Sequence, residues 1–129
     1  MDISLETARK TARKLKKAGL VWEPQAGDLY YWSKFDNPVL VMHSDSELLK
    51  KEQKTKGIVW APRLSQLLAE IERRGFDATL HVSTKAVVLR DEDTGTPLEW
   101  FIKANSLAEN AAEALLWILE REKNVTNDI

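Results

Sequence analysis

The clearest hydrophobic pattern lies in the second half of the chain, where two amphipathic helices are predicted. Leucines and an isoleucine recur at helical spacing over residues 62–74, after Pro62 and before a glycine, which suit a helix start and stop. A second helix is predicted over residues 106–123. The Ser106 and Glu109 capping box begins it, and alanines and leucines line one side of it.

Three strand-like runs lie between these helices: FDATLHVS, KAVVLRD and PLEWFIKA. In the first, apolar and polar residues alternate with period two, which predicts one buried and one exposed face. The short connections, including the turn DEDTGT, predict an antiparallel meander. The expected core of this half consists of Leu64, Leu67, Leu68, Ile71, Leu80, Val82, Val87, Leu89, Trp100, Ile102, Ala111, Leu115 and Leu119.

The first half of the chain carries weaker patterns. A short helix is predicted over residues 4–18, and its narrow apolar face, mostly alanine, needs a surface to dock on. The runs DLYYW and PVLVMH predict a β-hairpin over residues 28–43, with turn chemistry around Asn37 and Pro38. The stretch KKEQKTK, within residues 50–57, has no apolar residue and is expected to be exposed and mobile.

Together these elements predict a single α+β domain over residues 1–129. Helices would flank a largely antiparallel sheet, made of the hairpin and the three-stranded meander, with an extra N-terminal helix. We divide the domain into a basic N-terminal helix (1–20), an aromatic hairpin with a mobile basic loop (21–57), and a helix–meander–helix core (58–123).

Composition excludes several classes of function. The chain has 129 residues, no cysteine and two histidines, His43 and His81. Without cysteine there is no disulfide, thiolate zinc site, iron–sulfur cluster or cysteine nucleophile. No serine lies in a nucleophile elbow, and no glycine-rich loop matches a known phosphate-binding pattern. We therefore expect no catalytic, cofactor-binding or metal site, although catalysis by paired carboxylates stays open.

The charge is polarised along the chain. The net charge is −1, but residues 1–20 carry +4 and the other 109 residues carry −5. Six cations fan across one side of the predicted N-terminal helix: Arg9, Lys10, Arg13, Lys14, Lys16 and Lys17. Two interpretations stay open, namely a solvated helix face held to an acidic domain, or a surface that binds nucleic-acid phosphates or an acidic partner.

Trp117 is the residue that most suggests a contact with another protein. On the wheel of the last helix it lies among Glu113, Glu120 and Arg121, and Leu116 would widen the apolar area. An aromatic residue with a charged rim is typical of a contact site. Trp117 would then contact a partner protein or a second copy of the chain. Alternatively, the N-terminal helix or the hairpin covers it.

The segment WAPRLSQLLAEIERRG, followed by the meander and by SLAENAAEALLWIL, resembles the phage ABA-sandwich group of small uncharacterised phage and prophage proteins. The resemblance covers about residues 58–122. It rests on Trp60 and Pro62 before an LxxLL-type helix, and on the alanine-rich last helix. It implies a phage origin and no known activity, and it transfers no functional residue.

The sequence therefore favours a small, non-enzymatic phage- or prophage-type protein that acts by protein–protein interaction. The alternative is nucleic-acid binding through the basic N-terminal helix. No secretory signal and no apolar run of membrane-spanning length occurs, so we expect a cytoplasmic protein without a membrane partner.

Overall fold

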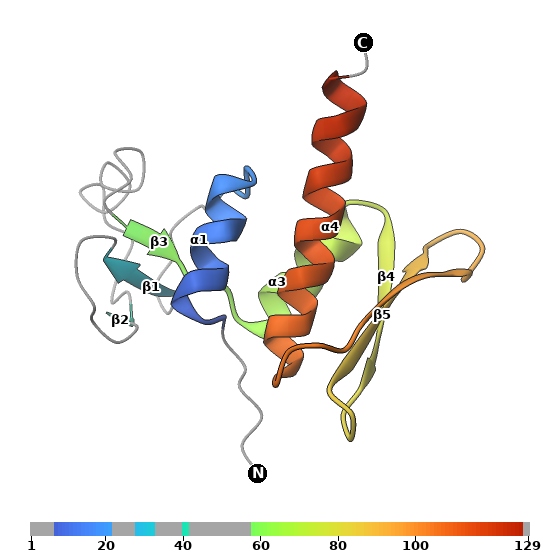
Figure 1. Ribbon diagram of the computed structural model, residues 1–129, viewed down its shortest axis with the longest axis horizontal. Helices are drawn as coiled ribbons and strands as arrows, with labels where there is room; N and C mark the ends of the chain where they lie inside the picture. The colour runs from blue at the N-terminus through green and yellow to red at the C-terminus, as the bar shows by residue number, and fades with distance from the viewer. Residues whose placement is uncertain (1–6, 22–27, 33–39, 42–57, 128–129) are drawn as a thin grey trace.

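The computed structural model describes residues 7–21, 28–32, 40–41 and 58–127 (Figure 1). Its helices are α1 (Arg9–Lys17), α3 (Leu64–Arg73) and α4 (Leu107–Asn127). Its strands are β1 (Leu29–Trp32), β2 (Leu40–Val41), β3 (Ile58–Trp60), β4 (Phe76–His81), β5 (Ala86–Asp91) and β6 (Pro97–Phe101). The predicted α+β class and N-terminal helix are confirmed. The predicted hairpin turn and the loop at 50–57 lie outside the described residues.

The strands form two three-stranded antiparallel sheets, ordered β2-β1-β3 and β4-β5-β6. The hairpin and the meander therefore belong to different sheets. In the first sheet, Tyr31 of β1 pairs with Val59 of β3. The sequence pattern missed β3, because three residues are too few to show an alternation.

Helix α1 lies between the first sheet and helix α4 (Figure 1). Its Ala12 packs into a small cluster with residues of β1 and β3, including Leu29 and Val59. Its Leu15 belongs instead to the main core, which α3, α4 and β5 share. A helix with a weak apolar face is thus stabilised by packing on two sides.

Helices α3 and α4 cover one face of the β4-β5-β6 sheet (Figure 1). Leu67, Ile71, Val87, Leu89 and Leu115 are almost fully buried between these layers. Burying each such side chain is worth about 1.5–3 kcal/mol. The main core is therefore the space between the two helices and the inner face of the meander, as the spacing of these residues predicts.

Helix α3 ends where the sequence predicts. Gly75 has φ of +87°, a conformation that favours glycine, and its N–H donates to the Glu72 carbonyl at 3.0 Å. The helix starts at Leu64, two residues after Pro62. Both ends follow from local chemistry, and this explains why the sequence locates them.

Three residues of the predicted core are exposed instead. The exposed fraction is 59% for Val82, 54% for Trp100 and 58% for Ile102. In their place, Phe101 of β6 packs against the main core. Of the other predicted core residues, Leu64, Leu68 and Leu80 are partly buried.

The register of the sheet explains this difference. Strand β5 pairs Val87 with Phe101 and Val88 with Trp100. Directly paired residues share a face of a sheet, so Phe101 joins Val87 under the helices and Trp100 lies on the other side. Val82 is exposed because β4 ends at the preceding residue, and the chain turns there.

Asn110 of α4 is a polar residue that is almost fully buried. Its Nδ2 donates to the carbonyls of Lys85 (2.7 Å) and Ala104 (3.3 Å), and its Oδ1 accepts from the Ala104 N–H (3.0 Å). This side chain therefore ties α4 to the β4–β5 turn and to the segment that follows β6.

Candidate interaction surfaces

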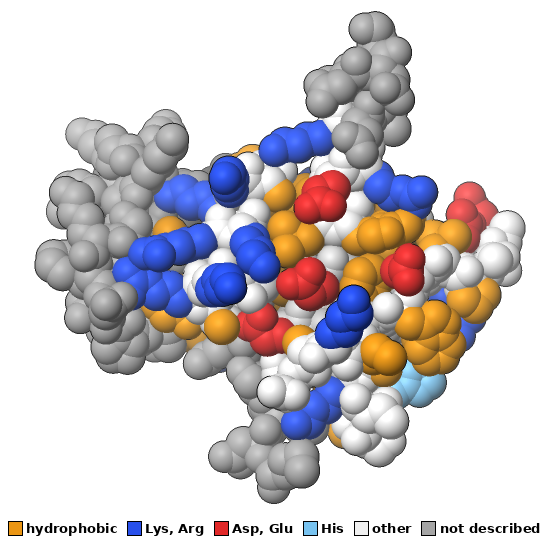
Figure 2. Space-filling view, viewed as in Figure 1, with side chains coloured by type: hydrophobic (Ala, Val, Ile, Leu, Met, Phe, Trp, Pro, Cys, Tyr) orange, Lys and Arg blue, Asp and Glu red, His pale blue; other side chains and the backbone are white. Residues whose placement is uncertain are grey.

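The six predicted cations all lie on α1, where Figure 2 shows Lys and Arg side chains gathered on the front of the molecule. Lys10, Arg13, Lys14 and Lys17 are exposed, and Arg9 and Lys16 are partly buried. Acidic side chains lie directly beside this basic surface (Figure 2). The basic surface is thus continuous along the helix but has an acidic flank on α4.

Glu109 joins α1 to α4. Its carboxylate accepts hydrogen bonds from the Ala8 N–H and the Thr11 hydroxyl, so a negative charge lies at the N-terminus of α1. The Glu109 N–H donates to the Ser106 hydroxyl oxygen at 3.0 Å, which is the expected first half of the capping box. The carboxylate, predicted to complete that box, caps the neighbouring helix instead.

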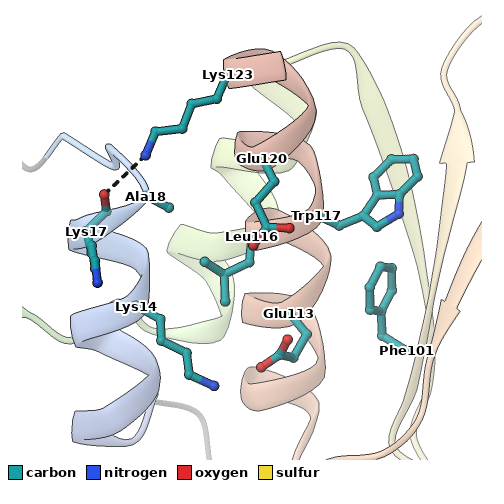
Figure 3. A pocket seen from close by; sticks show the side chains of 9 residues that line it. All are labelled: Lys14, Lys17, Ala18, Phe101, Glu113, Leu116, Trp117, Glu120 and Lys123. Atoms are coloured by element: carbon teal, nitrogen blue, oxygen red, sulfur yellow. Dashed lines mark hydrogen bonds between the residues drawn. The ribbon is translucent and has the colours of Figure 1, made fainter. Parts of the chain in front are cut away.

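A cleft of about 480 Å³ separates α1 from α4 (Figure 3). Lysines of α1 face glutamates of α4 across it, and its apolar wall continues to β6. Its lining residues are Lys14, Lys17, Ala18, Phe101, Glu113, Leu116, Trp117, Glu120 and Lys123. The structure therefore brings parts of the two predicted surfaces together at one cleft.

Trp117 is partly buried within its own chain. Its ring meets Phe76 edge to face, with ring centroids 6.3 Å apart, and the Arg121 guanidinium carbon lies 4.0 Å from its centroid. Helix α1 and Trp117 line the same cleft from different sides (Figure 3). Trp117 is therefore held mainly by β4 and by its own helix.

The predicted surroundings of Trp117 divide into buried and exposed residues. Leu116 is only 8% exposed and packs in the main core, so it does not widen an exposed apolar area. Glu120 and Arg121 are exposed, and Glu113 is partly buried. The surface around Trp117 is consequently smaller and more polar than the sequence suggests.

A second apolar surface lies on the side of the meander away from α3 and α4. We name it the open face and define it by Leu98, Trp100 and Ile102 of the β6 segment and His81 of β4. Leu98 is 40% exposed, and the His81 ring stacks on Trp100 with centroids 5.7 Å apart. Figure 2 shows apolar side chains beside this histidine.

The open face is not predicted from the sequence, although the sequence contains one signal for it. Apolar residues occupy both parities of the β6 segment, with Phe101 between Trp100 and Ile102. A strand of this kind can turn either side to the core, so alternation alone does not decide between them. Trp100 and Ile102 are predicted to lie in the core, and the strand register places Phe101 there instead.

A second cleft, of about 540 Å³, runs beside residues 99–104 of the β6 segment and reaches α4. It shares Phe101, Glu113 and Trp117 with the cleft beside α1. The outer edge of β6 is therefore open to an approaching chain.

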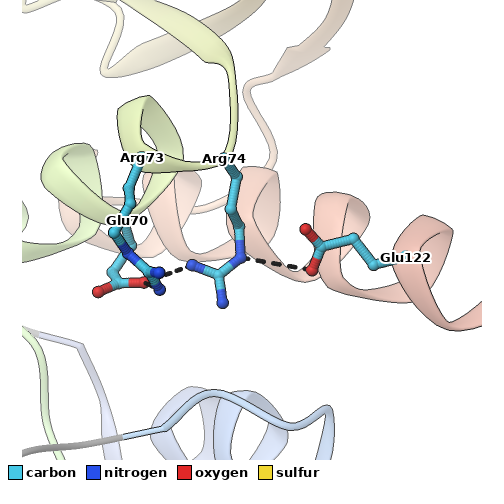
Figure 4. A network of polar contacts seen from close by, with 4 residues as sticks. All are labelled: Glu70, Arg73, Arg74 and Glu122. Carbon is cyan, nitrogen blue, oxygen red and sulfur yellow. Dashed lines mark hydrogen bonds and ion pairs between the residues drawn. The ribbon is translucent and has the colours of Figure 1, made fainter.

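A network of charged side chains joins the end of α3 to α4 (Figure 4). Glu70 accepts from Arg73 at 2.7 Å and also from Arg74, whose Nε lies 3.4 Å from the Glu122 carboxylate. Burial raises the pKa of Glu70, but the hydrogen bonds and charges of the two arginines outweigh it and lower that pKa. This network is structural and faces neither cleft.

In the described part of the chain, no three histidine or acidic side chains are grouped as metal ligands would be. His43 lies outside that part. Among the described helices, none has both the length and the apolar character needed to cross a bilayer.

Comparison with protein-family models, with curated proteins and with solved structures finds no match to this chain. The phage or prophage origin inferred from the resemblance of residues 58–122 stays a prediction.

Proposed function

We propose that this protein is a protein-interaction module and that the open face is its contact surface. One observation carries the proposal. A tryptophan and two aliphatic side chains, each at least 40% exposed, lie close together in sequence: Leu98 and Trp100 in β6, where a bulge interrupts the pairing at Leu98, and Ile102 just after it. Exposed apolar patches of this kind mark contact sites on soluble proteins, and tryptophan is enriched among residues that dominate binding energy.

The stacking of His81 on Trp100 supports the proposal further. The two rings come from the outer strands and meet over β5, whose Ala86 and Val88 are buried. A ring that is already held in place loses less conformational freedom when a partner binds it. Trp100 is thus exposed and preorganised at the same time.

The test compares the native chain with a variant that carries Trp100→Ser and Ile102→Ser. Val21→Ser is the matched control, because Val21 is 70% exposed and lies outside the open face. Two properties are measured for each chain: the solution mass over a range of concentrations, and the set of proteins retained from an extract of the cells that produce it. We expect the double variant to lose an association that the native chain and the control keep. Identical results for all three chains would refute the proposal.

Nucleic-acid binding through α1 is the second candidate function, and the row of exposed lysines at positions 10, 14 and 17 favours it. Six cations allow at most six phosphate contacts, so binding to duplex should fall with salt no more steeply than a log–log slope of about −5. Reversing the three lysines to glutamate should abolish the binding, measured by fluorescence anisotropy. Binding that survives this reversal would place the site elsewhere, and no binding by the native chain would remove the candidate.

A further inference from the structure

We infer that the partner at the open face is a second copy of this chain, whose β6 pairs antiparallel with β6 about a two-fold axis at Phe101. This inference rests on the proposed function, because the paired strands would bring two open faces together. It follows from the free edge of β6, from the charges that flank Phe101 and from the apolar side chains between them.

Strand β6 ends the order β4-β5-β6, and no described strand pairs with its outer edge. The Asp91 N–H donates to the Thr96 carbonyl at 3.0 Å, so the backbone N–H of Asp91 points toward the β6 side of β5. In an antiparallel strand, the backbone N–H and C=O groups of every second residue point to the same neighbouring strand. The backbone groups of Leu89 and Val87 therefore also point toward β6. The residue between their partners, Trp100, then has its N–H and C=O on the outer edge.

A hydrogen bond at this edge agrees with that orientation. The Trp100 N–H donates to the carboxylate of the neighbouring Glu99, at the long distance of 3.4 Å. A backbone N–H that bonds only its exposed neighbour is available to another strand. The cleft beside residues 99–104 leaves space for that strand.

Charge selects the register of the pairing. With the two-fold axis at Phe101, Glu99 lies opposite Lys103 of the second copy, and the same contact occurs twice. Both side chains are exposed, but only Glu99 lies in β6; Lys103 lies in a bend two residues beyond its end, so this pairing would extend the strand through Lys103. An axis at Glu99 or at Lys103 would instead place like charges opposite each other, which destabilises strand pairs.

Registers shifted by one residue also lose the charge pairs. An axis at Trp100 would place Glu99 opposite Phe101, and an axis at Ile102 would place Lys103 opposite Phe101. With the axis at Phe101, Trp100 lies opposite Ile102 of the second copy on the open face. An aromatic ring opposite a β-branched side chain is a favourable cross-strand pair. Only this register satisfies the charged and the apolar side chains together.

The resulting dimer would have one continuous six-stranded sheet. The order would be β4-β5-β6 followed by the same strands of the second copy in reverse, so both free β6 edges would be covered. Such a two-fold contact uses the same surface on both copies and closes after two chains. The inference therefore predicts a dimer and no larger assembly through this edge.

The experiment uses the full chain and two exposed charge reversals, Glu99→Lys and Lys103→Glu. Each reversal places like charges opposite each other in the dimer. We expect the native chain to dimerise in sedimentation equilibrium and each reversal to raise the dimer dissociation constant roughly tenfold or more. An equimolar mixture of the two reversed chains restores both opposite-charge contacts, so it should form a heterodimer close to native affinity.

Glu72→Lys and Lys10→Glu are the controls, because they make the same charge changes at exposed positions on α3 and α1. Circular dichroism and thermal unfolding check that every variant folds. A native chain that is monomeric at all concentrations, reversals that dimerise like the controls, or a mixture that does not recover would each overturn the inference.

The two proposals can fail separately. If the native chain is monomeric but the Trp100→Ser and Ile102→Ser variant still loses a retained protein, the open face binds another partner and self-pairing is wrong. If that variant loses nothing and the charge reversals have no effect, both the proposed function and the self-pairing are wrong.

Discussion

Both faces of the β4-β5-β6 sheet carry large apolar side chains, but these side chains are buried on one face and exposed on the other. On the inner face, Val87 and Leu89 are fully buried beneath α3 and α4. On the open face, Trp100 and Ile102 remain more than half exposed. Hydrophobic character therefore does not by itself decide which face of this sheet becomes the core. The position of the helices and the strand register decide it.

The central strand shows that the open face is nonetheless ordered. Val88 points to this face and is fully buried, although none of the described helices covers it. Its cover comes from neighbouring strands, through the stacked His81 and Trp100 rings and the Arg90 Nε that donates to the Thr79 hydroxyl at 3.0 Å. A face can thus protect its centre with its own side chains and still leave apolar surface for a partner.

Truncating one side chain on each face tests this comparison most strongly. Leu89→Ala should lower the free energy of unfolding by about 2–5 kcal/mol, because it leaves a cavity in the main core. Ile102→Ala should lower it by less than about 1 kcal/mol, because that side chain is mostly exposed. Urea unfolding measures both. Equal costs at the two positions would show that the faces are assigned wrongly.

The next largest effect concerns Asn110, which ties α4 to the β4–β5 turn and to the segment after β6, at one end of the sheet. Asn110→Ala removes three hydrogen bonds and leaves backbone groups of Lys85 and Ala104 without their partner. We expect a loss of about 2 kcal/mol in unfolding free energy, the usual penalty for buried polar groups left unsatisfied. Asn110→Asp keeps the shape and the acceptor oxygen but loses the Nδ2 donor and sets a buried carboxylate against two carbonyls, so it should cost at least as much. An unchanged unfolding midpoint in Asn110→Ala would contradict this role.

A smaller effect extends the comparison to α1, which depends on contacts with neighbouring elements. Glu109→Ala removes the carboxylate that caps α1 and should cost about 1 kcal/mol, as other capping residues do. Hydrogen exchange should accelerate in α1 much more than in α4, which keeps its Ser106 cap. Glu113→Ala, on the same helix, is the matched control. Equal acceleration in both helices would refute the capping of α1 by Glu109.

The smallest expected effect on stability comes from the Glu70 ion pairs, which lie away from both faces of the sheet. The pKa of Glu70 is lowered below 4.5, so its contribution to stability is present above that pH and is lost as the pH falls through the lowered value. Glu70→Gln should therefore cost about 0.5–1 kcal/mol at pH 7, typical of a partly exposed ion pair. The native chain and the variant should converge in stability as the pH falls through the lowered pKa of Glu70. A difference that does not shrink as the pH falls would assign the effect to packing.

The sequence by itself determined the local elements. Helix α3 follows from its leucine spacing between Pro62 and Gly75, and α4 follows from its alanine-rich face and the Ser106 cap. The meander follows from alternating runs separated by short polar turns. These features depend on interactions between residues close in the chain, so composition and spacing are enough to reveal them.

Only the tertiary structure decided how these elements use their surfaces. It turned Phe101 inward and Trp100 outward, packed Trp117 against Phe76, and directed the Glu109 carboxylate to α1. Each outcome depends on a strand register or on a neighbour far away in sequence. No local pattern encodes these registers and contacts. The periodicity of a segment describes the segment's own helix or strand and not the element that packs against it.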